Sequence, residues 1–328
     1  MDKTIYEKLY QEGFLSNDSY TKIKSKESNP LFSVHWELKT LLYLGVMLLS
    51  TGLGVLIYKN IDTIGHQVIL ALIAAISFGC FAYCLKKKHP FSFDKVSSPN
   101  SFFDYILLLG CLSFLTFVGY LQFQYEVFGT RYGMATFIPM LVLFFVAYYF
   151  DHLGILSLAI TNLGLWMGIA VTPTQILANN DFNSDQIIYS GLLLGIILLL
   201  AAFLSERYNI KKHFKFTYQN FGLNLTFIAL LAGYYSFGSS TLLWIVALAA
   251  IALFYYKEAI REHSFYFLLV ITLYGYIAIS SVIIRGLIAL ADEGAIYLGL
   301  MYFIASGIGV ILFLINLNKK LKKHDHLQ

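Results

Sequence analysis

Charged residues are scarce in this sequence. Lysine, arginine, aspartate and glutamate together make up 13% of the 328 residues, whereas an ordinary soluble domain carries about 25%. A folded chain of this length needs many more charges to cover a surface that faces water. The scarcity excludes an ordinary soluble protein, and the 58% of hydrophobic residues favours a protein that lies in a membrane.

Cysteine and proline are also rare. The three cysteines, Cys80, Cys84 and Cys111, all fall inside apolar runs and not in loops, where a disulfide or a zinc site is usually built. We expect them to be small buried thiols without a redox role. The five prolines and 24 glycines exclude a collagen-like or proline-rich disordered chain.

Motifs of the common enzyme families are missing as well. The sequence contains no glycine-rich phosphate loop, no His-Glu-x-x-His helix and no Gly-x-Ser-x-Gly elbow. Asp151 and His152 are the nearest acid/base pair, but neighbours on a helix point to different faces, so they are interpreted as a polar turn between spans. Asp104 follows Ser101 at the spacing of a capping box. No catalytic residue, cofactor site or metal site is therefore predicted.

Long apolar runs account for most of the chain after residue 37. A helix needs roughly 20 apolar residues to cross the hydrocarbon core of a bilayer. The runs predict spans at 38–58, 66–85, 102–124, 134–150, 153–172, 187–204, 216–237, 240–256, 264–284 and 295–317. The predicted fold is all-α, a polytopic transmembrane helical bundle of about ten spans, with nine and eleven left open.

The first 36 residues differ from the rest of the chain. They mix charged residues with short apolar repeats, Gly13 stands where a helix would end, and Ser16 begins a fresh N-cap. Residues 1–36 are predicted to form a short cytosolic helical hairpin with an amphipathic lead-in. Residues 37–317 form the transmembrane bundle, and residues 318–328 form a basic cytosolic tail.

The basic residues predict an orientation. With about ten spans and the N-terminus inside, 20 of the 23 lysines and arginines fall in cytoplasmic segments. The outer loops hold the other three, which are Lys59, Arg131 and Arg285. Cytoplasmic loops of membrane proteins carry this excess of positive charge, so both termini are predicted to be cytoplasmic, with the protein in the bacterial inner membrane.

The centres of the predicted spans lack charge but contain neutral polar groups. The missing buried carboxylates argue against an ion-coupled carrier and against a retinal or haem protein. Thr217, Asn220 and Asn224 share one face of the seventh span, and Asn162 lies midway along the fifth. These four candidate residues of a polar bundle interior either form hydrogen bonds between helices or line a polar cavity.

Two spans carry small residues at the spacing that lets helices approach closely. Gly191 and Gly195 form a GxxxG pair on the sixth span, and Gly164 and Gly168 belong to a small-residue stripe on the fifth. Without bulky side chains between them, two backbones pack at short distance. We expect these faces to be contacts between helices.

The opening of the chain resembles a family of bacterial membrane proteins, the domain of unknown function 2157 (DUF2157). The segment from Leu9 to Ser16 is similar to the leader of that family, and the glycine-spaced helix from Leu41 to Gly54 is similar to its first span. Ile61 departs from the family pattern, which has tryptophan in the following turn. The resemblance covers about residues 1–90 and implies a multi-pass inner-membrane protein without an assigned activity or catalytic residues.

Three functions remain open at this point. The first is a non-enzymatic membrane protein that binds a protein partner through its cytosolic hairpin or has a structural role. The second is a carrier of a small neutral or amphipathic solute along the polar face of Asn162, Asn220 and Asn224. The third is a membrane enzyme that acts on lipid-linked substrates through Asp104, Asp151 and His152. The expected partners are the lipid bilayer and a protein; no nucleic acid and no cofactor is expected, and the oligomeric state stays open.

Overall fold

The computed structural model of the chain is helical in the part that it describes. It describes residues 10, 12–21, 35–129, 132–171, 185–238, 241–289 and 293–325. These ranges contain ten long α-helices, one short 3-10 helix and no β-strand. The all-α class predicted from the sequence is confirmed.

The chain divides into two compact units, Met1–Thr63 and Ile64–Gln328, which are described separately. In the first unit, Tyr10 stacks on Tyr20 with 4.3 Å between the ring centroids. The N–H of Gly13, whose φ is 76°, donates to the carbonyl oxygen of Tyr10, a conformation that glycine adopts without steric penalty. The hydroxyl oxygen of Ser16 then accepts a hydrogen bond from the N–H three residues later.

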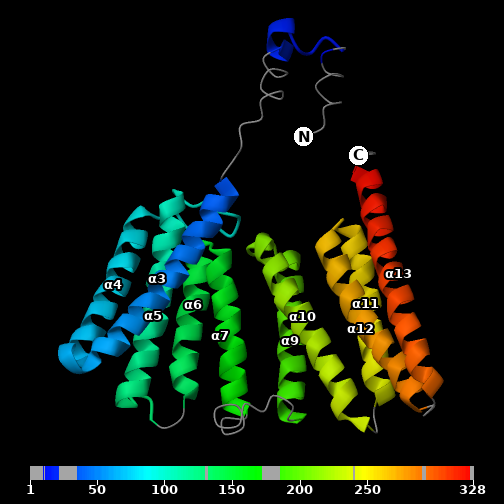
Figure 1. Cartoon of the computed structure of the whole chain (residues 1–328). Coiled ribbons are helices and arrows are strands. Elements are labelled where there is room, and N and C mark those ends of the chain that lie inside the picture. The colour runs from blue at the N-terminus through cyan, green and yellow to red at the C-terminus, as the bar shows by residue number, and fades with distance from the viewer. Residues whose placement is uncertain are drawn as a thin grey trace. The chain divides into compact units, whose positions relative to one another are not determined.

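The long helices follow the order of the chain. The first unit contains all but the last residue of α3 (His35–Ile64). The second contains α4 (His66–Lys87), α5 (Ser101–Tyr125), α6 (Gly133–Phe150), α7 (Leu153–Val171), α9 (Asp185–Arg207), α10 (Lys215–Ser236), α11 (Thr241–Arg261), α12 (Phe265–Ala289) and α13 (Glu293–Asp325). Each helix of the second unit packs against the next one along the chain, and they alternate in direction from α4 to α13 (Figure 1).

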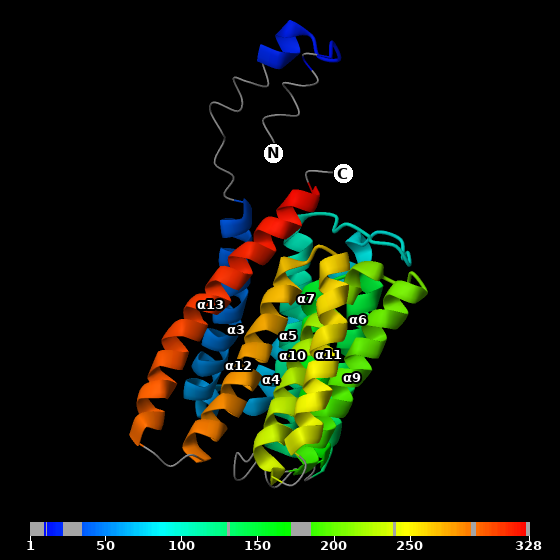
Figure 2. The ribbon, with the colours of Figure 1, turned by 90° about the vertical axis from the view of Figure 1, so that its right-hand side faces the viewer.

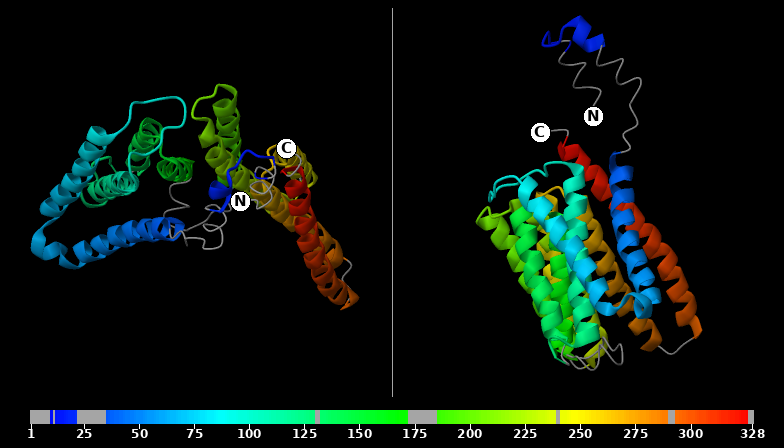
Figure 3. Two further views of the ribbon diagram at one scale, coloured as in Figure 1. Left: turned by 90° about the horizontal axis from the view of Figure 1, so that it is seen from above. Right: turned by 90° about the vertical axis from the view of Figure 1, so that its left-hand side faces the viewer.

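Contacts between non-consecutive helices centre on α10, which packs on α7 and α12 as well as on its two neighbours in the chain. The last helix, α13, lies at the edge of this unit beside α12 (Figure 2). One end of the second unit carries the loop 88–100, the turn 151–152, the connection 208–214 and the turn 262–264. We call it the basic end, because the loop 88–100 and the connection 208–214 contain four lysines. Figure 3 shows in its left view the loop 88–100 reaching toward the α9–α10 connection.

The helices agree with the predicted spans. The predicted fifth span, 153–172, is α7 (Leu153–Val171), and most other boundaries also agree within a few residues. The last helix is longer than predicted, because the basic segment that starts at residue 318 continues α13 as far as Asp325. By length and composition, seven helices of the described residues are able to cross a membrane, and shorter apolar stretches lie at Thr40–Val55 and Leu153–Gly168.

Buried side chains form two apolar cores inside the second unit. The first joins α4, α5, α6, α7, α9 and the start of α10, and it includes Leu107, Leu143 and Ile155, all fully buried. The second joins α9, α10, α11 and α12 around Phe227 and Leu268. Dispersion contacts within such cores hold helices together in an apolar solvent, where the hydrophobic effect contributes little.

Glycine brings α9 and α10 together at one crossing. A Cβ atom added to Gly195 would lie 2.9 Å from the backbone nitrogen of Thr226 and 3.2 Å from the carbonyl oxygen of Gly222. At Gly191, one turn earlier, the nearest atoms would be 3.9 Å away. The close approach of α9 and α10 therefore requires glycine at position 195 but not at position 191.

Large apolar side chains cover the outside of this unit. Phe78 on α4 is 75% exposed, Leu242 on α11 is 77% exposed and Met301 on α13 is 70% exposed. Soluble proteins rarely expose apolar surface to this extent. Lipid tails are as apolar as these side chains and are the surroundings that suit them.

Candidate functional site

The four polar residues predicted for the bundle interior do not gather around one cavity. Asn224 donates from its side-chain nitrogen to the side-chain oxygen of Asn220 at 2.9 Å. Tyr266 of α12 donates to the side-chain oxygen of Asn220 at 2.6 Å, and Tyr274 donates to that of Asn224 at 3.0 Å. The hydrogen bonds of this pair therefore run from α10 to α12, not to α7. Of the other two candidates, Thr217 is buried on α10 and Asn162 is half-buried on α7.

A groove of about 270 Å³ lies between α7, α9 and α10. The small residues predicted to bring these spans together line it, including Gly164, Gly168 and Gly191, next to Leu194 and Leu225. None of the four polar candidates is among its lining residues. The groove is apolar, so its chemistry suits a hydrocarbon chain better than a polar solute.

Asp151 and His152 form the two-residue turn between α6 and α7 that the sequence predicts. Asp151 has a φ of 59° and ends α6. The Nδ1 atom of His152 accepts a hydrogen bond from the N–H of Ile155 at 3.2 Å. A side chain that accepts from the first turn of a helix satisfies one of the amide groups left without an intrahelical partner. His152 thus caps α7.

A buried polar cluster, the Asp151 cluster, surrounds the carboxylate of this turn and consists of Asp151, Lys211, His213 and the backbone of Val96. One carboxylate oxygen lies 2.6 Å from Nε2 of His213. The other accepts from the N–H of Val96 at 2.5 Å and lies 3.3 Å from Nζ of Lys211. The side chains of Asp151 and Lys211 are each 1% exposed. Removing one charge from such a buried pair costs several kcal/mol, because the other charge stays out of water.

Lys211 also fastens the loop 88–100 to the α9–α10 connection. Its N–H donates to the carbonyl oxygen of Phe93 at 2.9 Å, and its Nζ donates to that of Asp94 at 3.3 Å. The Ser205 hydroxyl donates to the Lys211 carbonyl oxygen at 3.1 Å. The Asp151 cluster therefore ties together three connections of the basic end: the loop 88–100, the turn 151–152 and the segment 208–214.

Asp104 lies close to the same turn. Its Oδ1 atom is 3.9 Å from Nε2 of His152 and accepts a hydrogen bond from the Ser98 hydroxyl at 2.5 Å. The capping box predicted at Ser101 is wrong by one residue, since α5 begins at Ser101 and the N-cap is Asn100, which accepts from the N–H of Phe103 at 2.8 Å. The structure brings Asp104, Asp151 and His152 to one end of the bundle, with the two carboxylates facing different partners.

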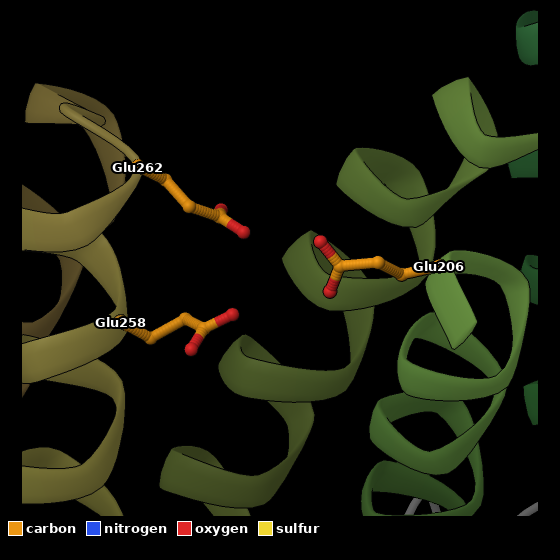
Figure 4. Close-up of side chains that lie close together, drawn as sticks. All are labelled: Glu206, Glu258 and Glu262. Carbon is orange, nitrogen blue, oxygen red and sulfur yellow. The ribbon is translucent and has the colours of Figure 1, made fainter.

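A second charged cluster at the basic end, the Lys215 cluster, surrounds the first residue of α10. Figure 4 shows Glu206 of α9 pointing toward Glu258 of α11 and toward Glu262 of the turn that follows α11, and their carboxylate oxygens lie within 4.8 Å of one another. Nζ of Lys215 is 2.6 Å from Glu206 and 3.3 Å from Glu258, and it also contacts Glu262. The three carboxylates are a ligand set for a hard divalent cation, but the ammonium group of Lys215 supplies the positive charge.

The carboxylates change the acidity of this lysine. Burial by itself lowers the pKa of Lys215, but the hydrogen bonds and charges of Glu206 and Glu262 outweigh burial, so the pKa is raised above its ordinary value of 10.5. Lys215 is therefore charged at every physiological pH. The ion pairs of the Lys215 cluster join the ends of α9, α10 and α11.

The sequence does not point to either charged cluster. In the sequence, Lys211 and Lys215 are recognisable only as basic residues of a predicted cytoplasmic segment, and nothing in the local pattern distinguishes them from the exposed Lys212. The only usable signal is Asp151, an acidic residue in a long apolar stretch, because a carboxylate near a membrane span usually has a cationic partner. The cysteines agree with the prediction of small buried thiols: Cys84 and Cys111 are buried, Cys80 is half-buried, and all are free.

Apolar helices of membrane-spanning length, exposed apolar faces and a concentration of basic residues at one end define a polytopic helical membrane protein. Residues 7–156 match the family model described as Predicted membrane protein (DUF2157). The resemblance noted in the opening residues is confirmed, and the match extends beyond residue 90 through α6 to the start of α7. No curated protein and no solved structure matches the chain.

Proposed function

We propose that this protein is a non-enzymatic component of the bacterial inner membrane. In this proposal the helical bundle is a scaffold with both termini in the cytoplasm, and the N-terminal hairpin binds a protein partner there. The orientation is supported by the 20 of 23 basic residues assigned to one side. Lys211, Lys215 and Lys257 all belong to the basic end, which would face the cytoplasm.

One observation carries the non-enzymatic part of the proposal: the charged side chains of the Asp151 cluster and of the Lys215 cluster are bonded to one another. Asp151 is bonded to Lys211 and His213, and Lys215 is bonded to glutamates of α9 and α11. A catalytic acid or base needs a place for substrate within hydrogen-bond reach. Because these charged groups are already bonded to neighbouring segments of the protein, we infer that they hold the bundle together.

The same reasoning favours the scaffold over the carrier. A carrier of a polar solute needs a path lined by groups that release their partners to the solute. Asn220 and Asn224 are bonded to Tyr266 and Tyr274, and bonds of this kind between membrane helices contribute about 0.6 kcal/mol each. These asparagines therefore suit a helix–helix contact between α10 and α12.

The partner-binding part rests on the hairpin. Phe14 lies between its turn and the short helix that follows, and its side chain is 75% exposed. Aromatic residues are enriched in the contact surfaces of proteins, and an exposed aromatic side chain is free to pack against a partner. We therefore assign Phe14 as the contact residue of the hairpin.

Photo-crosslinking in cells tests this assignment. A photoreactive amino acid is placed at position 14 and, as a control, at Tyr125, which lies at the opposite end of α5 from the basic end. We expect a discrete protein adduct from position 14 only, and we expect a chain without residues 1–30 to behave like a null strain. No adduct at position 14, together with normal function of the truncated chain, would contradict the proposal.

A separate variant tests the enzyme alternative. His152→Ala removes the cap of α7 and the only imidazole near Asp104 in the described part of the chain. We expect this variant to lose stability and to keep its function wherever its amount in the membrane is restored. Loss of function at a normal amount of protein, with the adduct at position 14 retained, would favour an enzyme.

A further inference from the structure

Two connections at the basic end present apolar side chains to the surroundings. Phe91 and Phe93 of the loop 88–100 are 46% and 60% exposed, and Tyr208 and Ile210 of the α9–α10 connection are 67% and 40% exposed. The rings of Phe91 and Phe93 meet edge to face, with 5.3 Å between their centroids. We call these four residues, with Lys95 and Lys212, the loop-tip patch.

Lys211 holds the two halves of the loop-tip patch together. Besides its hydrogen bonds to the carbonyl oxygens of Phe93 and Asp94, its Nζ lies 5.2 Å from the centre of the Phe91 ring. The ion pair with Asp151 in turn fixes the Lys211 side chain. The patch is thus one preorganised surface, and exposing it does not require either connection to rearrange.

The position of α9 places the loop-tip patch beside the bilayer. Leu200, Phe203 and Leu204 are 54%, 60% and 47% exposed along one face of this helix. Tyr208 continues the same face by helical spacing, and its N–H still donates to the carbonyl oxygen of Leu204 at 3.0 Å. A lipid-facing stripe that ends in tyrosine has reached the headgroup level of the membrane.

The charge of the loop-tip patch selects among lipids. Lys95 and Lys212 are both exposed, and Asp94 is the one acidic residue in segments 88–98 and 207–212. Lys88 and Arg207 add further positive charge to the same segments. A cationic surface at headgroup level attracts anionic phospholipids, and each lysine near the surface contributes about 1 kcal/mol.

We propose that the loop-tip patch is a binding site for anionic phospholipid. Phe91 and Phe93 insert into the headgroup region of the adjacent leaflet, while Lys95 and Lys212 bind the phosphate groups of its lipids. The Lys211–Asp151 ion pair keeps these side chains on one surface. This inference does not depend on the hairpin partner or on which side of the membrane the basic end faces.

The depth of the loop measures the insertion. Nitroxide labels are attached at Phe93→Cys and, as a control, at His263→Cys in the exposed α11–α12 turn of the same end, in a chain whose own cysteines are replaced by alanine. The labelled full-length chains are placed in nanodiscs that contain phosphatidylglycerol. We expect the label at position 93 to be more accessible to oxygen and less accessible to a water-soluble nickel chelate than the label at position 263.

Matched charge changes measure the lipid preference. Lys95→Gln/Lys212→Gln is compared with Lys257→Gln/Lys319→Gln, which removes two exposed lysines of α11 and α13. The affinity for phosphatidylglycerol is measured in phosphatidylcholine nanodiscs by native mass spectrometry, with thermal unfolding as the check of folding. We expect the affinity to fall about fivefold for each lysine of the patch and to change little in the control.

Two results would overturn the proposal. One is equal accessibility of the labels at positions 93 and 263 to the nickel chelate, which would place the phenylalanines in water and favour a protein as their binding partner. The other is an equal loss of affinity for phosphatidylglycerol in both double variants. That result would mean that the lipid responds to the overall positive charge of the basic end and not to a site at the loop-tip patch.

Discussion

Asp151 and Lys211 lie 3.3 Å apart, carboxylate oxygen to ammonium nitrogen, with both side chains 1% exposed. Asp151 comes from the turn between α6 and α7, and Lys211 comes from the connection between α9 and α10. Through backbone bonds to Val96, Phe93 and Asp94, the pair also holds the loop 88–100. A chain with few charges thus buries two of them to join three connections of its basic end.

Breaking this ion pair from one side is expected to destabilise the protein strongly. Asp151→Asn leaves the Lys211 ammonium buried without a countercharge, which costs about 3–5 kcal/mol. Asp151→Asn/Lys211→Met removes both charges and is expected to cost less than the sum of the single changes. Thermal unfolding in detergent measures the three variants. Exposed Asp94→Asn is the control, and strictly additive losses would contradict the pairing.

The close crossing of α9 and α10 predicts a difference between two glycines on the same helix. Gly195→Ala places a methyl group 2.9 Å from the backbone nitrogen of Thr226, so the helices must separate. We expect a loss of about 1–3 kcal/mol, the usual cost of overpacking. Gly191→Ala meets atoms only at 3.9 Å and is expected to be neutral. Equal unfolding temperatures for both variants would show that the crossing is looser than the structure indicates.

Replacing Lys215 is expected to create a cation site. Lys215→Ala removes the ammonium group from among Glu206, Glu258 and Glu262, whose oxygens lie within 4.8 Å of one another. Calcium binds sets of carboxylate oxygens, and a ligand at 100 times its dissociation constant adds about 2.7 kcal/mol of stability. Calcium should therefore raise the unfolding temperature of Lys215→Ala and leave the native protein and Lys212→Ala unchanged. A response shared by all three proteins would speak against the site.

Alkaline pH is expected to weaken the native Lys215 cluster. The pKa of Lys215 is raised above its ordinary value of 10.5 because its glutamate contacts outweigh burial. A raised pKa in the folded state contributes stability that is fully present below the unfolded-state pKa and is lost as the pH rises through the folded-state pKa. Lys215→Arg keeps its charge there, so its unfolding temperature should fall less above about pH 10.5. Parallel curves for the two proteins would mean that another group controls the alkaline loss.

The positions of the helices follow from the sequence, whereas their partners do not. A segment such as 153–172 must form a helix because lipid offers no hydrogen bonds to its backbone, and α7 occupies Leu153–Val171. Lipid-facing and core-facing sides are both apolar, however, so the pattern does not define how a helix is rotated. The bonds of Asn220 and Asn224 to Tyr266 and Tyr274 depend on that rotation.

The charged clusters escape prediction for a related reason. Glu206, Lys215 and Glu258 lie in different helices, and only the folded bundle brings their side chains together. The start of α5 shows a smaller limit, since Asn100 and Ser101 are both good caps and the helix uses the first. The spans and the family resemblance could be predicted from the sequence, because each depends on residues that are close in the chain. The predicted hairpin falls mostly on residues 1–9 and 22–34, which lie outside the described residues.

Topology mapping by cysteine accessibility tests the central claim of a scaffold whose basic end faces the cytoplasm. Lys257→Cys is exposed on α11 near the basic end, and Val127→Cys is 56% exposed beyond the opposite end of α5. A membrane-impermeant thiol reagent should label position 127 in intact spheroplasts and position 257 only after the membrane is opened. Labelling of position 257 in intact spheroplasts would reverse the orientation and contradict the account.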